Sequence, residues 1–218
     1  DHDLPEDALV LCCFNTLFKI CPCVLAFCLR VMSHNPESVL WLSASDDEAR
    51  RNLRRAAEKA GVDPDRLIFA PRVPNDEHLE RHRHADLFVD TFACNAHTTA
   101  NDALWAGLPV VTRVGKQMSA RVAASLLKAV GLPELITSSD EDYEALILEL
   151  ARDAAKRRAL RQKLADLRPN AALFDTALYT RHLEAGFDAA YDRFLKGLPP
   201  EDFRVARYTG HSACPASA

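Results

Sequence analysis

Short apolar runs alternate with longer amphipathic segments along the first 140 residues of the chain. The runs are too short for helices and are bounded by polar or turn-forming residues, as buried strands are. They are Leu9–Phe14, Val39–Leu42, Leu67–Phe69, Leu87–Val89 and Leu108–Thr112. Because strands that alternate with helices form parallel sheets, the pattern predicts an α/β domain with a mostly parallel sheet and helices on both faces.

Apolar positions between the runs recur at spacings of three and four residues, which indicates amphipathic helices. One helix is expected to open at Pro22, and the others cover Asp46–Ala60, Asp76–His84, Thr98 to Gly107, Met118–Val130, Asp140–Leu167 and Phe174–Leu195. The last of these carries an apolar stripe formed by Tyr179, Leu183, Phe187, Tyr191 and Phe194. We expect this stripe to cover the domain and to extend toward a neighbour.

The pattern divides the chain into four segments. Residues 1–8 form a polar leader, and residues 9–139 hold the strands of the predicted lobe. Residues 140–197 are expected to form carboxy-terminal helices that pack on this lobe. Residues 198–218 are small and polar, so we expect a mobile tail.

Composition narrows the class of protein. The chain has 218 residues, of which 48% are hydrophobic and 27% charged, as in an ordinary globular domain. A net charge of −4 leaves no basic stripe, so we expect no nucleic-acid partner. Because no run of eighteen apolar residues occurs, we also expect no membrane span and no secretory signal.

The seven cysteines are Cys12, Cys13, Cys21, Cys23, Cys28, Cys94 and Cys214. Most lie in an apolar strand and a predicted helix, which favours reduced thiols in a cytoplasmic protein over a disulfide framework. The Cys21-Pro22-Cys23 spacing lacks the two-residue spacer of zinc sites. The D-x-D sequence Asp63-Pro64-Asp65 precedes a strand, where we expect a turn and no metal.

The stretch Asp86–Thr112 combines a strand, a polar loop, a helix and a second strand. Ala103, Leu104 and Trp105 are expected to pack against the sheet, and Gly107 suits the left-handed position that ends a helix. The loop must lie at the carboxyl ends of the strands, where open parallel sheets bind ligands.

Polar side chains cluster where this loop meets the helix. Asn95, His97, Thr98 and Thr99 lie where free N–H groups and the helix dipole favour a phosphate. Asp102 follows one turn later on the face of the threonines, within reach of a ribose. The alternative is that Thr98 or Thr99 is an ordinary N-cap, with Asp102 closing a box-like turn.

Basic side chains elsewhere allow two interpretations each. Lys19 follows the first strand at the same edge and could neutralise a diphosphate, although most lysines are solvated. Arg121 could approach the phosphates or fix the loop before it. His78 alone is typical of a helix surface. The run Arg81–His84 reads as a solvated face.

The string CNAHTTANDALWAGLPVVT at Cys94–Thr112, followed by SARVAASLL at Ser119–Leu127, closely resembles the protein O-GlcNAc transferases. Further matching strings are FNTLFKI at Phe14–Ile20, SVLWL at Ser38–Leu42, RLIFAPRVPNDEH at Arg66–His78 and ADLFVDT at Ala85–Thr91. The resemblance runs from about Leu9 to about Leu195. It implies the carboxy-terminal, Rossmann-like lobe of a two-lobed GT-B glycosyltransferase that uses UDP-GlcNAc.

The resemblance also implies roles for individual residues. Lys19 would contact the diphosphate and act catalytically, and the N–H groups of Thr98 and Thr99 would hold the same group. The backbone at Arg72 and Val73 would read the uracil edge. His78 would stack on the base, His97 would lie beside the nucleotide and diphosphate, and Asp102 would hold the ribose. No metal and no cofactor would be needed.

Inverting transfer of GlcNAc to protein Ser or Thr is the implied reaction. In the family, an amino-terminal lobe completes the acceptor cleft and a helical-repeat region recruits protein substrates. Since this chain starts where the second lobe starts, we expect a truncated form with little or no activity in isolation.

Two alternatives stay open. The first is a related transferase with another donor such as GDP-fucose, although His97 and Asp102 favour UDP-GlcNAc. The second is a non-catalytic nucleotide-binding or interaction module. Thr16 and Asn75 depart from residues usual in the animal enzymes, which would lower nucleotide affinity.

Overall fold

A six-stranded parallel sheet organises the computed structural model, which describes residues 4–44 and 46–207. The strand order is β3-β2-β1-β4-β5-β6, and every pairing is parallel. The strands are β1 Leu9–Cys13, β2 Ser38–Ser43, β3 Leu67–Ala70, β4 Leu87–Val89, β5 Val110–Arg113 and β6 Ile136–Thr137. The predicted α/β class and the first five strands are confirmed. The two-residue β6 was not predicted.

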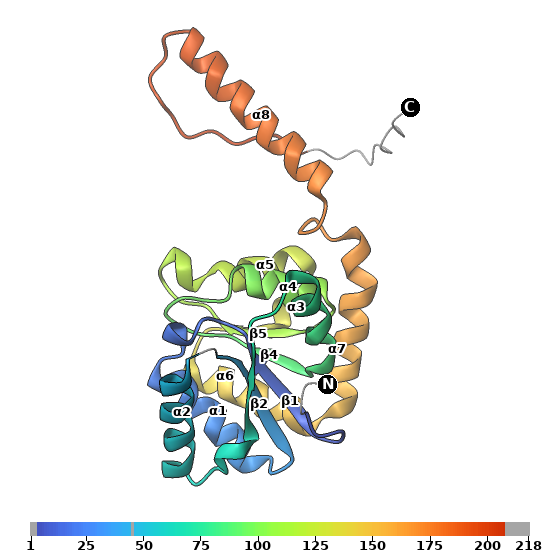
Figure 1. The fold of residues 1–218 in the computed structure, drawn as a ribbon. Helices are drawn as coiled ribbons and strands as arrows, with labels where there is room; N and C mark the ends of the chain where they lie inside the picture. The colour runs from blue at the N-terminus through green and yellow to red at the C-terminus, as the bar shows by residue number, and fades with distance from the viewer. Residues whose placement is uncertain (1–3, 45, 208–218) are drawn as a thin grey trace. The chain divides into compact units, whose positions relative to one another are not determined.

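Helices cover both faces of this sheet (Figure 1). They are α1 Pro22–His34, α2 Asp47–Lys59, α3 Asn75–Arg81, α4 Thr98–Trp105, α5 Val122–Val130, α6 Asp140–Arg152 and α7 Ala154–Leu167. The last helix, α8 Thr176–Leu195, belongs to a separate unit of the chain. Helix α1 packs with α6, and α4 packs with α5. Because crossovers between parallel strands are right-handed, the connections that leave β1 and β4 in opposite directions place their helices on opposite faces.

The strands are apolar because they are buried on both faces. Leu11 and Phe88 lie in the centre of the sheet without solvent exposure. From α4, Ala103 and Leu104 join this core as predicted. The prediction for Trp105 is wrong, since half of its surface (51%) is exposed. The last turn of α4 rotates this residue away from the sheet.

Helix α4 ends at a glycine in the predicted left-handed conformation. Gly107 has φ +86°, a backbone angle at which any residue with a side chain would be strained. Its N–H donates to the carbonyl of Leu104, and the N–H of Leu108 donates to that of Ala103. The chain therefore turns directly from α4 into the approach to β5.

The predicted helix Asp140–Leu167 is divided into α6 and α7. The break lies at Asp153, whose backbone (φ −108°, ψ 89°) is not helical. The Asp153 side chain accepts a hydrogen bond from the N–H of Lys156 at 2.9 Å and so caps α7. A charged residue in the middle of a periodic pattern thus acts as an N-cap.

Residues from Asn170 onward form a second compact unit that holds α8. The stripe residues of this helix are exposed, Tyr179 and Phe187 by 65% each. The packing of α8 on the lobe stays a prediction. Residues 208–218 of the expected tail, and residues 1–3 of the leader, lie outside the described part of the chain.

The cysteines correct one expectation. Cys21 and Cys23 form a disulfide across Pro22, at the start of α1, so the prediction of reduced thiols is wrong for this pair. Free thiols are present at Cys12, Cys13, Cys28 and Cys94, while Cys214 lies outside the described residues. Burial raises the pKa of the Cys28 thiol to about 12.

Across residues 4–44 and 46–207, no helix is both long enough and apolar enough to cross a bilayer.

Candidate functional site

The strand order creates a crevice between the carboxyl ends of β1 and β4. From β1 the sheet continues to β2 on one side and to β4 on the other, so the connections diverge at this point. Open α/β sheets bind ligands at such a switch point. The loops after β1 and β4 meet there, since the Nζ of Lys19 donates to the carbonyl of Asn95 at 3.0 Å. Lys19 therefore lies at the predicted edge of the sheet.

Asp90 ends β4 and anchors the loop that follows it. This fully buried carboxylate accepts hydrogen bonds from the N–H groups of Thr91 at 2.7 Å and Ala96 at 2.6 Å. Its other oxygen accepts from the hydroxyl of Thr112 on β5 at 2.6 Å. Burial raises the pKa of Asp90 to about 7, although these donors act in the opposite direction.

Asn15 joins the loop after β1 to the start of α4. Its side-chain amide donates to the hydroxyl of Thr91 at 2.8 Å and to Asp90 at 3.3 Å. Its carbonyl oxygen accepts from the hydroxyl of Thr99 at 2.8 Å. These bonds join the two loops at the switch point into one polar network. In the same loop, the buried Oδ1 of Asn95 has no partner among the described residues.

The first turn of α4 faces this crevice. His97 is the N-cap, and its side chain makes no capping bond to a described backbone group. The alternative in which Thr98 or Thr99 caps the helix is therefore wrong. Thr98 is exposed and Thr99 is half-buried. Since the first N–H groups of an α-helix have no intrahelical partner, they are free to bind an anion.

The ring of His97 is fixed by the loop before α5. Its Nε2 lies 3.1 Å from the carbonyl oxygen of Ser119. A carbonyl oxygen only accepts, so Nε2 carries the proton and Nδ1 is left for another contact.

His78 of α3 faces Asp102 of α4, with 4.0 Å between Nε2 and Oδ2. Burial first, and then the charge of Arg81, lower the pKa of His78 to about 4. The ring is therefore neutral near pH 7, and the contact with Asp102 is no ion pair. Burial also raises the pKa of Asp102.

The prediction that Arg81–His84 is a solvated face is wrong in part. Arg81 is 4% exposed and His82 is fully buried, whereas Arg83 and His84 are exposed. The ring of His82 and the guanidinium plane of Arg81 both pack against the ring of Phe14, which follows β1.

A cavity of about 730 Å³ opens beside this cluster, between the ends of β1, β2 and β3 and helix α3. Thr16, Arg72, Val73, His78 and Thr99 line it. Lys19, His97, Thr98 and Asp102 are not in its lining. The His78–Asp102 contact places Asp102 beside it, His97 and Thr98 directly precede Thr99 in the chain, and Lys19 bonds to the loop before α4. The structure thus brings the predicted residues to one edge of the sheet in two adjoining groups.

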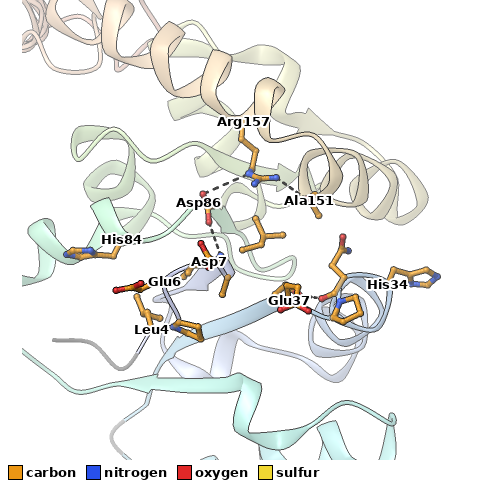
Figure 2. A pocket seen from close by; sticks show the side chains of 16 residues that line it. Leu4, Glu6, Asp7, His34, Glu37, His84, Asp86, Ala151 and Arg157 are labelled. Carbon is orange, nitrogen blue, oxygen red and sulfur yellow. Dashed lines mark hydrogen bonds and ion pairs between the residues drawn. The ribbon is translucent and has the colours of Figure 1, made fainter.

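A second cavity, of about 720 Å³, lies at the opposite edge of the sheet (Figure 2). Asp86 occupies its wall, where it accepts from the N–H of Val10 at 2.9 Å and lies 3.9 Å from Arg157. Glu6, Asp7 and Glu37 add further negative charge. It contains none of the predicted site residues and lies at the amino ends of the strands. An anion such as a diphosphate is therefore expected at the carboxyl ends of the strands, where Lys19 and the start of α4 lie.

Sequence reasoning missed three residues that build the site: Asn15, Arg81 and Asp90. Asp90 directly follows β4, and Asn15 directly follows the apolar run Leu9–Phe14. This position after an apolar run was the signal that could have identified both. Arg81 gave no such signal, because a charged residue in a basic run reads as exposed.

No group of three or more His, Cys, Asp or Glu side chains that could hold a metal ion occurs among residues 4–44 and 46–207. The Asp63 side chain accepts from the N–H of Asp65 at 2.9 Å, so the D-x-D sequence forms the predicted turn.

A family model and individual relatives indicate the same family of glycosyltransferases for this chain. A model of glycosyl transferase family 41 matches residues 1–183. A UDP-N-acetylglucosamine–peptide N-acetylglucosaminyltransferase of Caenorhabditis elegans is 34% identical over 96% of the chain. The protein SEC of Arabidopsis thaliana, named as a probable enzyme of the same activity, is 36% identical over 94%. The chain spans 18% and 21% of the lengths of these relatives.

Solved structures agree in fold. A mutant O-GlcNAc transferase of Thermobaculum terrenum is 31% identical and matches with a TM-score of 0.78, over 85% of this chain and 38% of that one. A sucrose-phosphate synthase of Thermosynechococcus elongatus matches over 86% of this chain and 47% of that one, with a TM-score of 0.63 and 18% identity, which shows the fold alone. These neighbours have the GT-B architecture, so the predicted Rossmann-like lobe is confirmed.

Proposed function

This chain belongs to glycosyl transferase family 41, and from that premise we propose that it is the UDP-GlcNAc-binding lobe of a protein O-GlcNAc transferase. One observation carries the proposal. The cation of Lys19 is held 3.0 Å from the carbonyl of Asn95, directly before the N-terminus of α4. A positive charge and free N–H groups thus meet at one point, as a diphosphate requires.

The reaction we propose is an inverting displacement. The oxygen of a protein Ser or Thr hydroxyl forms a bond to the anomeric carbon of GlcNAc, and the bond from that carbon to the β-phosphate oxygen breaks. The hydroxyl proton leaves to a base, and UDP departs with the bonding electron pair. Negative charge therefore grows on the diphosphate, where Lys19 and the N–H groups of Thr98 and Thr99 stabilise it.

The remaining residues bind the nucleotide. The cavity beside α3 accommodates the base, with the backbone at Arg72 and Val73 on its edge and His78 on its face. Asp102 holds the ribose. The half-buried His97, whose Nε2 proton is directed to Ser119, leaves Nδ1 for the nucleotide. This lobe uses no metal and no cofactor in the proposal.

We propose a protein acceptor, an amino-terminal lobe and a helical-repeat region as partners, because the relatives are several times longer than this chain. We propose a cytoplasmic location, for which the free thiols at Cys12, Cys13, Cys28 and Cys94 are the support and the Cys21–Cys23 disulfide is the observation against it.

UDP is expected to bind the chain detectably and GDP to bind more weakly. Uracil is a smaller base than guanine, and we expect backbone groups between Ala70 and His78 to form hydrogen bonds with its edge. Isothermal titration calorimetry with both nucleotides measures this difference, and the exchange Asp102→Ala provides the control by weakening both. Equal binding, or no binding by a folded sample, would contradict the proposal and leave GDP-fucose or a non-nucleotide role.

A further inference from the structure

Arg81 is a buried cation beside the nucleotide cavity, and the proposed function gives it no task. It ends α3 and is 4% exposed. Its guanidinium carbon lies 4.4 Å from the centre of the Phe14 ring. Its Nη1 donates to the carbonyl of Pro71 at 2.9 Å. A stacked plane with a fixed donor cannot rotate freely, so the other two nitrogens point in set directions. Of these, Nε is buried without a partner among the described residues.

The other terminal nitrogen, Nη2, contacts the Nδ1 of His78 at 2.5 Å. A guanidinium is always protonated in proteins and only donates. The Nδ1 of His78 must therefore accept, and the proton of the neutral ring must be on Nε2. This Nε2 is the atom that faces Asp102 at 4.0 Å.

We infer that Arg81 is a positioning residue that holds His78 as the neutral tautomer with its proton on Nε2, which presents an uncharged ring and one N–H donor to the bound nucleotide. The inference rests on the proposed function for the identity of the ligand. The tautomer itself follows from contacts within the ligand-free chain.

The charges around His78 act in opposite directions. Arg81 and His82, from its own helix and the following turn, face it and disfavour a second proton. Asp102 of α4 favours one from 4.0 Å, and Asp46 and Arg72 line the same cavity. Burial opposes a charged ring most strongly. The contact with Arg81 acts in the same direction, because a protonated Nδ1 would place two donors against each other at hydrogen-bond distance.

The consequence is a ring that stays neutral throughout the physiological range. An imidazolium would carry a hydration shell and would be repelled by Arg81, whereas a neutral imidazole stacks on a base without either cost. We therefore expect the contribution of His78 to nucleotide binding to be constant between about pH 5 and 8.

Nitrogen-15 NMR of the wild-type chain tests the inference without nucleotide. With labelled histidine, and with the His78 signals identified by their loss in His78→Asn, the expected spectrum shows a protonated Nε2 and an unprotonated Nδ1. The signals should not shift toward the doubly protonated form above about pH 5. A proton on Nδ1, or a midpoint near the ordinary value of about 6.5, would overturn the inference.

Variants then test the cause. Arg81→Met should move the titration midpoint of His78 upward and weaken UDP binding by up to about tenfold, the scale of one stacked ring. Inorganic pyrophosphate should bind only at Lys19 and the start of α4. Its affinity should therefore be the same for Arg81→Met and the wild-type chain. Arg81→Lys keeps the charge and one donor and should restore part of the effect. Arg83→Met, an exposed neighbour paired with Glu80, is the matched control.

The two arms separate the possible failures. If wild-type chain bound neither UDP nor pyrophosphate, the proposed function would be wrong, while the tautomer would still be decided by the ligand-free spectrum. If UDP bound to the wild-type chain, and Arg81→Met changed neither the titration midpoint of His78 nor the affinity for UDP, the positioning role would be wrong. Should Arg81→Met not fold, the wild-type spectrum and Arg81→Lys decide the question.

Discussion

Replacing Lys19 with alanine, in an enzyme that carries this lobe together with its acceptor-binding lobe, is expected to lower kcat by about 10²-fold or more. The diphosphate gains negative charge as it leaves, so a cation beside it stabilises the transition state more than the bound donor. Lys19 is already held at the switch point by its 3.0 Å bond to the carbonyl of Asn95. The change in KM should be smaller.

Steady-state kinetics on a peptide acceptor measure this effect, and two further variants make it specific. Asp102→Ala removes a contact to a ribose whose charge does not change, so it should act mainly through KM. Lys116→Ala removes an exposed lysine from the loop after β5 and should leave both constants unchanged. A Lys19→Ala enzyme with normal kcat and a raised KM would show that Lys19 is only a binding residue.

The second large effect is on stability. Asp90→Ala is expected to lower the free energy of unfolding by at least about 3 kcal/mol. The substitution leaves the N–H groups of Thr91 and Ala96, the amide of Asn15 and the hydroxyl of Thr112 without their acceptor in a buried site. Chemical denaturation followed by circular dichroism measures the loss.

Asp90→Asn is the matched control for this prediction. Its oxygen can accept from the N–H groups, and its amide can donate to the Thr112 hydroxyl, so the loss should be much smaller. A loss as large as that of Asp90→Ala would indicate that the charge, and not the hydrogen-bond geometry, holds the loop.

The difference in unfolding free energy between the wild type and Asp90→Asn is expected to depend on pH, and the direction follows from the pKa of Asp90. The folded-state pKa of Asp90, about 7, is above its ordinary value of 3.8. Folded protein therefore binds more protons than unfolded protein between about pH 4 and 7. The Asp90 contribution is complete below pH 4 and is lost as the pH rises through 7, by at most about 1.4 kcal/mol per unit.

His78 and His82 act in the opposite sense, because burial lowers their pKa values to about 4. Their contribution is present above about pH 6.5 and is lost as the pH falls. The difference between wild type and Asp90→Asn cancels these histidines. That difference should shift in favour of wild type from pH 7 to pH 5, and a constant difference would contradict the raised pKa.

Strands were predictable from sequence because a parallel sheet covered on both faces requires apolar runs. The two residues of β6 are too few to form such a run. The division between α6 and α7 was missed because Asp153 interrupts neither apolar spacing nor charge pattern. Its capping role depends on a backbone angle, which a pattern does not encode.

The position of the site was predictable for a related reason. The loops that follow parallel strands meet at one edge of the sheet, and the pattern places Lys19 and His97 in two of these loops and Asp102 in the helix after the second. Their roles stay predictions. The burial of Arg81 was not predictable, since it depends on the ring of Phe14 and the carbonyl of Pro71. Local sequence indicates the charge of a residue, but distant packing determines whether water reaches it.

The central position of β1 has a consequence during synthesis. Leu11 of β1 pairs with Leu87 of β4, so at about 5 to 20 residues per second the ribosome needs about 4 to 15 seconds to supply the second neighbour of this strand. Until then the nascent chain exposes one open hydrogen-bonding edge of an entirely apolar strand, which is a site for aggregation. Chaperone demand should therefore be greatest while α1, β2, α2 and β3 have emerged but β4 has not.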